Sequence, residues 1–401
     1  MLKNKNAGLT VKASAVVLGV AMALSATTAQ AGAREQAKRM FDRIAGVPPS
    51  EAQINAMVGA MSADPTYAEA VSAAATAFDS PSFYNVTLKN LATPWTNEAQ
   101  TVFEDLNDFS ATVIGLVRDD ADFRTVLYDN VVYVGASGGL TAYSNSNNQH
   151  YVDLEASGAN LGDSGVLVRR TQTQVSGLPD AGTAGVMTTR AAAKAFFVAG
   201  TNRAMFRFTL MNFLCNDLEQ VKDTSRPSDR VRQDVSRSPG GDSRIFLNSC
   251  VGCHSGMDPL AQAFAYYEWT GEEGTDAGEL IYTPGTVQGK YLINADNFRY
   301  GYVTPSDRWD NYWRTGQNSA LGWSGSLSGS GNGAKSLGME LAHSNAFAQC
   351  QAKQVFKTVC LHTPTTANDH DQINTMVSAF QGSNYQMKSL FTNAAAYCRG
   401  E

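Results

Sequence analysis

The stretch Asn248–Leu260 reads NSCVGCHSGMDPL and contains a Cys-x-x-Cys-His motif, the most informative feature of this 401-residue chain. In a helix, Cys250 and Cys253 lie one turn apart and point to the same side, and His254 follows at once. This arrangement suits a haem attached through two thioethers, with the imidazole as an iron ligand. A thioredoxin-like redox dithiol and half of a zinc site use the same residue types.

The sequence around the motif favours the haem. A redox dithiol is expected between a strand and a helix of a parallel sheet, whereas an Arg- and Gly-rich loop, residues 222–244, precedes this motif. A zinc site needs a second ligand pair at finger spacing, and none is near. Because the motif occurs once, we predict one covalent haem c, held by Cys250 and Cys253 with His254 on the iron.

The second axial ligand is left open by the sequence. Met257 follows His254 by three residues on the same side of the ring, so we expect it to pack instead of reaching the distal face. Met339 and His343 are spaced i,i+4 on a helix expected later in the chain, and either can point into a haem crevice. We take Met339 as the candidate metal ligand; His343, another residue or an open position are the alternatives.

Arginines before the motif are candidate partners of the haem propionates. A guanidinium binds a carboxylate through two hydrogen bonds, which makes Arg237 and Arg244 candidate haem-binding residues, with Arg232 as a further choice. Most of such a run is ordinarily solvated surface. The aromatic residues between 309 and 323 can form a binding platform or pack beneath a long loop, and we favour packing.

The N-terminus predicts the compartment. Three lysines precede the apolar run Ala13–Ala26, and the A-x-A pattern Ala29–Ala31 follows, which is typical of a removable signal peptide over residues 1–31. The run is too short to span a bilayer. Cleavage changes the net charge from −6 to −9, because it removes three lysines and no acid. We therefore expect a periplasmic protein with no membrane span after cleavage and no nucleic-acid partner.

Four cysteines lie outside the motif, and an oxidising compartment favours pairing them. They are Cys215, Cys350, Cys360 and Cys398. Two disulfides are expected, and the sequence leaves the three possible pairings open. Cys215 ends an apolar run, so a buried free thiol is the alternative for it.

Hydrophobic periodicity predicts a mainly α fold: a multi-helical N-terminal region, then a helical domain like a c-type cytochrome with long irregular loops. Residues 34–130 and 185–221 have a helical pattern, and Ser50 with Gln53 resembles a capping box. Two closing helices are expected around 336–360 and 369–397.

Breaks in this pattern predict loops and boundaries. Residues 133–148 and 324–332 are rich in Gly, Ser and Asn, and we expect loops there. Asp258 and Pro259 are expected to open a new helix that carries Tyr267. We divide the chain into a signal peptide (1–31), a helical N-terminal domain (32–148), a helical middle segment (149–221) and a haem c domain (222–401).

The chain resembles the planctomycete-type secreted cytochrome family of Gram-negative bacteria. The resemblance rests on Ala37–Glu51 with Ser80–Phe83, on Gly185–Thr189 with Asn202–Arg203 and Phe213–Cys215, and on Cys250–Leu260 with the later helix that begins at Cys350. It implies a mostly helical periplasmic haem protein without a defined substrate. The aromatic region 298–323 has no place in the family pattern.

These observations predict a periplasmic mono-haem c-type cytochrome that passes single electrons to or from a partner protein. Two alternatives remain: a haem-dependent oxidoreductase acting on a small or polymeric substrate, and a partner- or polysaccharide-binding module with an accessory haem. The chain is longer than the roughly one hundred residues that a minimal domain of this kind needs, which favours a role beyond electron shuttling.

Overall fold

The computed structural model describes residues 32–136, 138–198, 200–272 and 275–400. The predicted signal peptide, residues 1–31, lies outside them. The described residues form a mainly α fold, as the sequence predicts, with three two-stranded antiparallel sheets. No helix in this part of the chain is both long enough and apolar enough to cross a membrane.

The helices and strands have the following bounds. The first eight helices are α1 (Ala33–Ala45), α2 (Glu51–Gly59), α3 (Tyr67–Ala74), α4 (Lys89–Ala92), α5 (Asp108–Arg118), α6 (Gln149–Ala156), α7 (Gln172–Val175) and α8 (Arg190–Phe196). The other helices are α9 (Arg203–Leu214), α10 (Ser243–Ile245), α11 (Val251–Ala261), α12 (Gly333–Ala342), α13 (Asn345–Cys360), α14 (Ala367–Gly382) and α15 (Met387–Tyr397). The strands are β1 (Val132–Gly135), β2 (Leu167–Arg170), β3 (Tyr267–Trp269), β4 (Leu280–Tyr282), β5 (Arg308–Asp310) and β6 (Ser330–Asn332).

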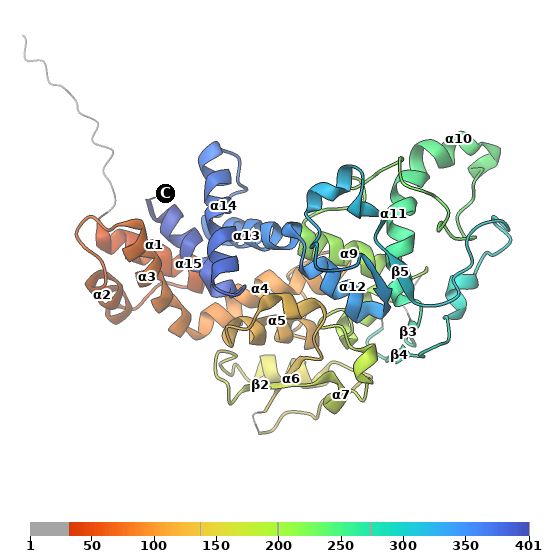
Figure 1. Ribbon diagram of the computed structural model, residues 1–401. Helices are drawn as coiled ribbons and strands as arrows, with labels where there is room; N and C mark the ends of the chain where they lie inside the picture. The colour runs from red at the N-terminus through yellow and green to blue at the C-terminus, as the bar shows by residue number, and fades with distance from the viewer. Residues whose placement is uncertain (1–31, 137, 199, 273–274, 401) are drawn as a thin grey trace, which may run out of the picture.

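Helices from the two ends of the chain pack against each other. α1 and α3 lie against α15, and α13 to α15 pack together beside them, at the left of Figure 1. The apolar positions of α1 predicted to face the core, such as Met40 and Ile44, are fully buried. The capping box of α2 is confirmed: Ser50 accepts from the Gln53 backbone N–H while the Gln53 side chain accepts from the Ser50 backbone. The predicted division into domains stays a prediction.

The C-terminal region forms four helices, so the prediction of two is wrong. α12 ends one residue before His343, and the Ser344 side chain caps α13 by accepting from the Phe347 backbone N–H. Asn384 and Tyr385 both have positive φ, which separates α14 from α15. Gly382 is the last residue of α14, so a glycine does mark this second break in the sequence.

Two segments expected to be loops contribute short strands. β1 begins just before residue 133 and pairs with β2, and β6 occupies 330–332 and pairs with β5. Such strands of three or four residues are too short to show an alternating pattern. The predicted start of a helix at Asp258 is also wrong, because α11 continues through Pro259 to Ala261, and Tyr267 lies in β3.

α9 is the central element that positions the site. It packs against α11 on one side and against α13 on another. Its first residue, Arg203, follows Asn202, whose side-chain amide donates to the carbonyls of Phe264 and Tyr267 beyond the end of α11. This buried amide fixes the start of α9 beside α11. In Figure 1, α10 and α11 lie at the opposite end of the molecule from α1.

The four cysteines outside the motif form two disulfides, as expected from their even number. Cys215 pairs with Cys350, and Cys360 pairs with Cys398. The alternative of a free thiol at Cys215 is therefore wrong. The first disulfide joins the residue after α9 to α13, and the second joins α13 to the end of the chain. Both reinforce contacts between segments far apart in sequence.

Candidate functional site

The two cysteines of the motif lie on one continuous helical segment. A π-helical turn, Phe246–Cys250, leads directly into α11, so Cys250 and Cys253 are separated by about one turn, as predicted. Both thiols are unpaired and partly exposed. Burial raises the pKa of the Cys253 thiol, and the nearby Glu219 adds to this effect. Both thiols can therefore be reached by a ligand from solvent.

The setting of these thiols differs from that of a redox dithiol. The motif follows a helix and lies inside a helix, and every named sheet of the described residues is antiparallel. Within the described ranges, no group of three His, Cys, Asp or Glu side chains is arranged to hold a metal ion. A haem iron receives its equatorial ligands from the porphyrin, so an axial imidazole alone can serve it.

His254 is oriented by a buried carboxylate one helical turn further on. Its Nδ1 lies 3.1 Å from Oδ1 of Asp258, and the imidazole remains about one-fifth exposed. A carboxylate can only accept, so Nδ1 carries the hydrogen, and in the neutral imidazole the lone pair is then on Nε2. This geometry leaves Nε2 of His254 available to bind a metal.

Asp258 is fully buried and is held by two arginines. Arg203 donates to both carboxylate oxygens at 2.7 and 3.0 Å, and the backbone N–H of Arg232 donates to Oδ2 at 3.3 Å. On its other side Arg203 donates to Asp234 at 2.6 and 3.0 Å. Burial opposes ionisation of Asp258, but Arg203 and Arg232 outweigh it and hold the pKa well below its usual range. The carboxylate behind His254 is therefore charged at any physiological pH.

An apolar pocket adjoins the Cys250 side of the motif. Cys250 packs with Val231 and Phe246, and these two residues also line an open pocket of about 390 Å³. The cysteines and His254 do not line it themselves. Phe298 and Leu247 add apolar surface, and Leu247 is more than half exposed. Exposed apolar side chains next to a pocket are typical of a ligand-binding surface.

Arg237 supplies the positive charge of this pocket. Its guanidinium carbon lies 4.7 Å from the Phe246 ring centre and 4.4 Å from that of Phe298, between the two rings. It donates to the carbonyls of Val235 and Val231, at 2.7 and 2.9 Å. Burial lowers the pKa of Arg237 from its ordinary value. The side chain is thus fixed at the wall of the pocket, in reach of an anionic ligand group.

The other two candidate arginines lie elsewhere. Arg244 has a side chain 82% exposed and is paired with Asp242 two residues earlier, so the structure places it on the solvated surface. Arg232 is almost fully buried and contacts Asp258 and the ring of Tyr291. Arg232 therefore lies next to the carboxylate that orients His254.

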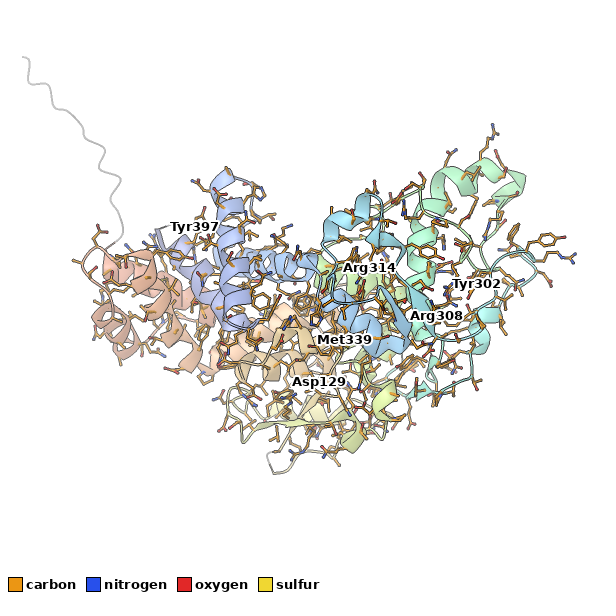
Figure 2. The ribbon with its side chains drawn as sticks, in the orientation of Figure 1. Asp129, Tyr302, Arg308, Arg314, Met339 and Tyr397 are labelled. Atoms are coloured by element: carbon orange, nitrogen blue, oxygen red, sulfur yellow. A yellow bond between two sulfur atoms is a disulfide. The ribbon has the colours of Figure 1, made fainter. Side chains whose placement is uncertain are left out.

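Of the two candidate distal ligands, Met339 lies on α12 and His343 is the residue that follows this helix. Met339 is partly exposed, and its carbonyl accepts from Nδ1 of His343. The His343 ring packs near that of Tyr128, with 5.7 Å between ring centres. Figure 2 shows Met339 near the middle of the molecule, well apart from Tyr302 of the pocket. No interaction among the described residues brings Met339 or His343 to the motif, and Met257 is buried, as expected.

The aromatic region packs beneath the motif helix. Trp309 and Trp313 are buried in the main core, and Trp313 lies directly against Gly256 of α11. Tyr312 and Trp323 are only partly buried, and their polar atoms are bonded to protein groups, Tyr312 to Asp229 and Trp323 to backbone carbonyls. The preference for packing over a binding platform is confirmed for the two buried tryptophans.

The sequence interpretation missed Asp258, Arg203 and Asp234 as site residues. Asp258 follows His254 at i+4, a spacing that brings two side chains together in a helix. The expectation of a helix start at Asp258 concealed this relationship. Arg203 and Asp234 reach the site from other segments, and no local signal indicates them.

A second, larger pocket lies between α8, α9 and the segment 96–107. Its volume is about 660 Å³, and its lining contains two cations, Arg190 and Lys194, and four acids including Asp276. Both cations already pair with Asp276. The pocket includes Ala204, the neighbour of Arg203 on α9.

Comparison of the chain with family models, curated proteins and solved structures gave no match. The function is therefore argued from the site itself.

Proposed function

We propose that this chain is a periplasmic mono-haem c-type cytochrome that exchanges single electrons with a partner protein. The observation that carries the proposal is the geometry of the motif. Two unpaired thiols lie one turn apart on a partly exposed helical segment, and an adjacent imidazole keeps its Nε2 free because Nδ1 is bound to Asp258. These are the groups needed for two thioethers and one axial bond.

The surrounding residues fit a haem c. A bound haem would supply an iron that changes between Fe(III) and Fe(II) and so carries one electron at a time. Cys250 and Cys253 would hold the haem, and Asp258 fixes the orientation of the His254 ring. The apolar wall formed by Phe246 and Phe298 suits a porphyrin face, and Arg237 suits a propionate.

The cellular setting and the family are part of the same proposal. The signal-peptide pattern in residues 1–31 supports export, and two disulfides suit an oxidising compartment. The resemblance to planctomycete-type secreted cytochromes supports the same assignment. Neither of them identifies the redox partner.

The test is to produce the full chain in a host that matures c-type cytochromes. We expect a pyridine haemochrome spectrum with two thioethers and a mass increase of one haem. Cys250→Ala and Cys253→Ala should each reduce the attachment to one thioether or none. The matched control is the double variant Cys360→Ala/Cys398→Ala, which should keep both thioethers. No covalent haem in the wild-type protein, or two thioethers in Cys250→Ala, would show the assignment to be wrong.

A haem-dependent oxidoreductase is the second candidate, and the 660 Å³ pocket beside α9 favours it, since it is large enough for a small substrate. Met339 and His343 lie apart from the motif contacts, which is compatible with an open iron position. A high-spin ferric spectrum with rapid cyanide binding supports this candidate. A low-spin spectrum that cyanide does not change supports electron transfer alone.

A further inference from the structure

The imidazole of His254 has a single orienting partner among the described residues. That partner is Asp258, at 3.1 Å from Nδ1, and the two residues lie one turn apart on α11. Because Asp258 is fully buried and accepts from Arg203 and from the Arg232 backbone, its carboxylate cannot swing away from the ring. The ring therefore has a fixed tautomer before any ligand binds.

The charge nearest to the imidazole is negative. Arg203 and Arg232 neutralise Asp258, and within the described residues they contact its carboxylate, Asp234, Thr201 and the Tyr291 ring, not the ring of His254. A carboxylate that accepts from a metal-bound imidazole makes that imidazole a stronger electron donor. An iron with a more strongly donating ligand is stabilised as Fe(III).

The geometry points to Asp258 as a positioning residue that holds His254 in its Nδ1–H form and lowers the reduction potential of the haem. The statement about the reduction potential rests on the proposed function. The statement about the tautomer concerns the protein without haem. Arg203, which is held by Asp234, keeps the carboxylate in place.

The tautomer is tested without haem, by nitrogen chemical shifts of His254 in the mature Cys250→Ser/Cys253→Ser protein. We expect the Nδ1–H form in this protein and a mixture of tautomers after Asp258→Ala. Asp234→Asn is the matched control, because Asp234 contacts Arg203 but not the imidazole. If the protein with Asp258 and the Asp258→Ala variant show the same mixture of His254 tautomers, Asp258 is not a positioning residue.

The potential is tested by redox titration of the haem-loaded protein. Asp258→Asn keeps an amide oxygen near Nδ1 but removes the charge. We expect it to favour reduction at least tenfold, which is about 59 mV for a one-electron couple. Arg203→Lys leaves the carboxylate less neutralised and should shift the potential in the opposite direction. Asp234→Asn again serves as the control and should have a smaller effect than Asp258→Asn.

Each outcome has one meaning. If the wild-type protein binds no haem, the proposed function fails, while the chemical shifts still decide the positioning role. If haem is attached but Asp258→Asn leaves the potential unchanged, the inference about the potential is wrong and the proposed function stands. If Asp258→Asn does not fold, the sign of the shift in Arg203→Lys decides: a fall supports the inference and a rise or no change overturns it.

Discussion

Cys215, the residue after α9, is joined by a disulfide to Cys350 in α13, with 5.1 Å between their Cα atoms. α9 begins with Arg203, which holds the carboxylate behind His254. The disulfide thus connects the helix that supports the candidate site to the C-terminal helices. α9 is therefore the structural link between the site and the C-terminal helices.

Removing this disulfide should destabilise the protein more than removing the other one. The two bridges span 135 and 38 residues, so the chain-entropy model gives losses of about 5 and about 4 kcal/mol, respectively. The measurement is denaturant unfolding of Cys215→Ala/Cys350→Ala and Cys360→Ala/Cys398→Ala. A smaller loss for the first pair would show that native contacts, and not the length of the closed loop, set the stability.

Gly256→Ala should destabilise the protein although alanine favours helices. A Cβ at this position would lie 1.9 Å from Nε1 of Trp313, which is fully buried and cannot move aside. We expect a loss of about 2 kcal/mol or more in the free energy of unfolding, since overpacking outweighs the helix-propensity gain of about 1 kcal/mol. Thermal and denaturant unfolding measure it.

Gly59→Ala is the control for that substitution. Gly59 ends α2, and nothing lies within 4 Å of a Cβ placed there. It should leave stability unchanged or raise it by up to about 1 kcal/mol. Equal effects of the two variants would contradict close packing of Trp313 on α11.

Local sequence patterns are sufficient to predict the mainly helical class and the helical placement of the two motif cysteines. Met40 and Ile44 show the period of α1, and Ser50 with Gln53 marks the start of α2. These are interactions between residues three or four positions apart, which sequence spacing reports directly. The His254–Asp258 pair is of the same kind, but Asp258–Pro259 also resembles a helix start, and this second pattern conceals the pair in the sequence.

The rest of the site depends on tertiary contacts. Arg203 precedes Asp258 by 55 residues and reaches it because Asn202 fixes the start of α9. The pairing of Cys215 with Cys350 likewise depends on the contact of α9 with α13. No spacing rule predicts contacts between residues so far apart in the sequence.

Glu340→Ala should cost about 2 kcal/mol, because it removes the carboxylate partner of the partly buried Arg314 and the acceptor of the buried Asn311 amide. The Glu340 side chain is 1% exposed; it accepts from Arg314 at 2.7 and 2.8 Å and from Asn311 at 2.8 Å. This interaction holds α12 against the aromatic region. Denaturant unfolding is the measurement.

Glu51→Ala is the matched control for Glu340. Glu51 pairs with Arg34 at the surface, where the two side chains are 75% and 48% exposed. Its loss should stay below about 1 kcal/mol. A large effect at Glu51 together with a small one at Glu340 would reverse the predicted order.

Asp369 should make stability depend on pH in acid. Backbone N–H groups of Thr366 and Thr365 donate to it and lower its pKa, and the Tyr397 hydroxyl adds to this. A carboxyl with a lowered pKa contributes stability above its unfolded pKa of about 3.9 and loses it as the pH falls. The difference in unfolding free energy between wild type and Asp369→Asn should therefore shrink below about pH 4. A difference independent of pH would contradict this role.

Arg237, and not Arg244, should affect the haem. Arg237 is fixed between Phe246 and Phe298 at the pocket wall, whereas Arg244 is exposed and paired with Asp242. Removing a positive charge near the iron favours Fe(III), so Arg237→Leu should lower the reduction potential measured by redox titration. Arg244→Leu should leave it unchanged, because solvent and salt screen an exposed charge.

Arg237→Lys separates charge from packing in this prediction. Lysine keeps the positive charge but loses the flat guanidinium between the two rings. We expect its potential to lie closer to the wild-type value than that of Arg237→Leu. If Arg237→Lys and Arg237→Leu shift the potential equally, the effect comes from packing of Phe246 and Phe298 and not from a charge beside the propionates. If neither shifts it while Arg244→Leu does, the haem lies on the Arg244 side of the motif and the pocket assignment is wrong.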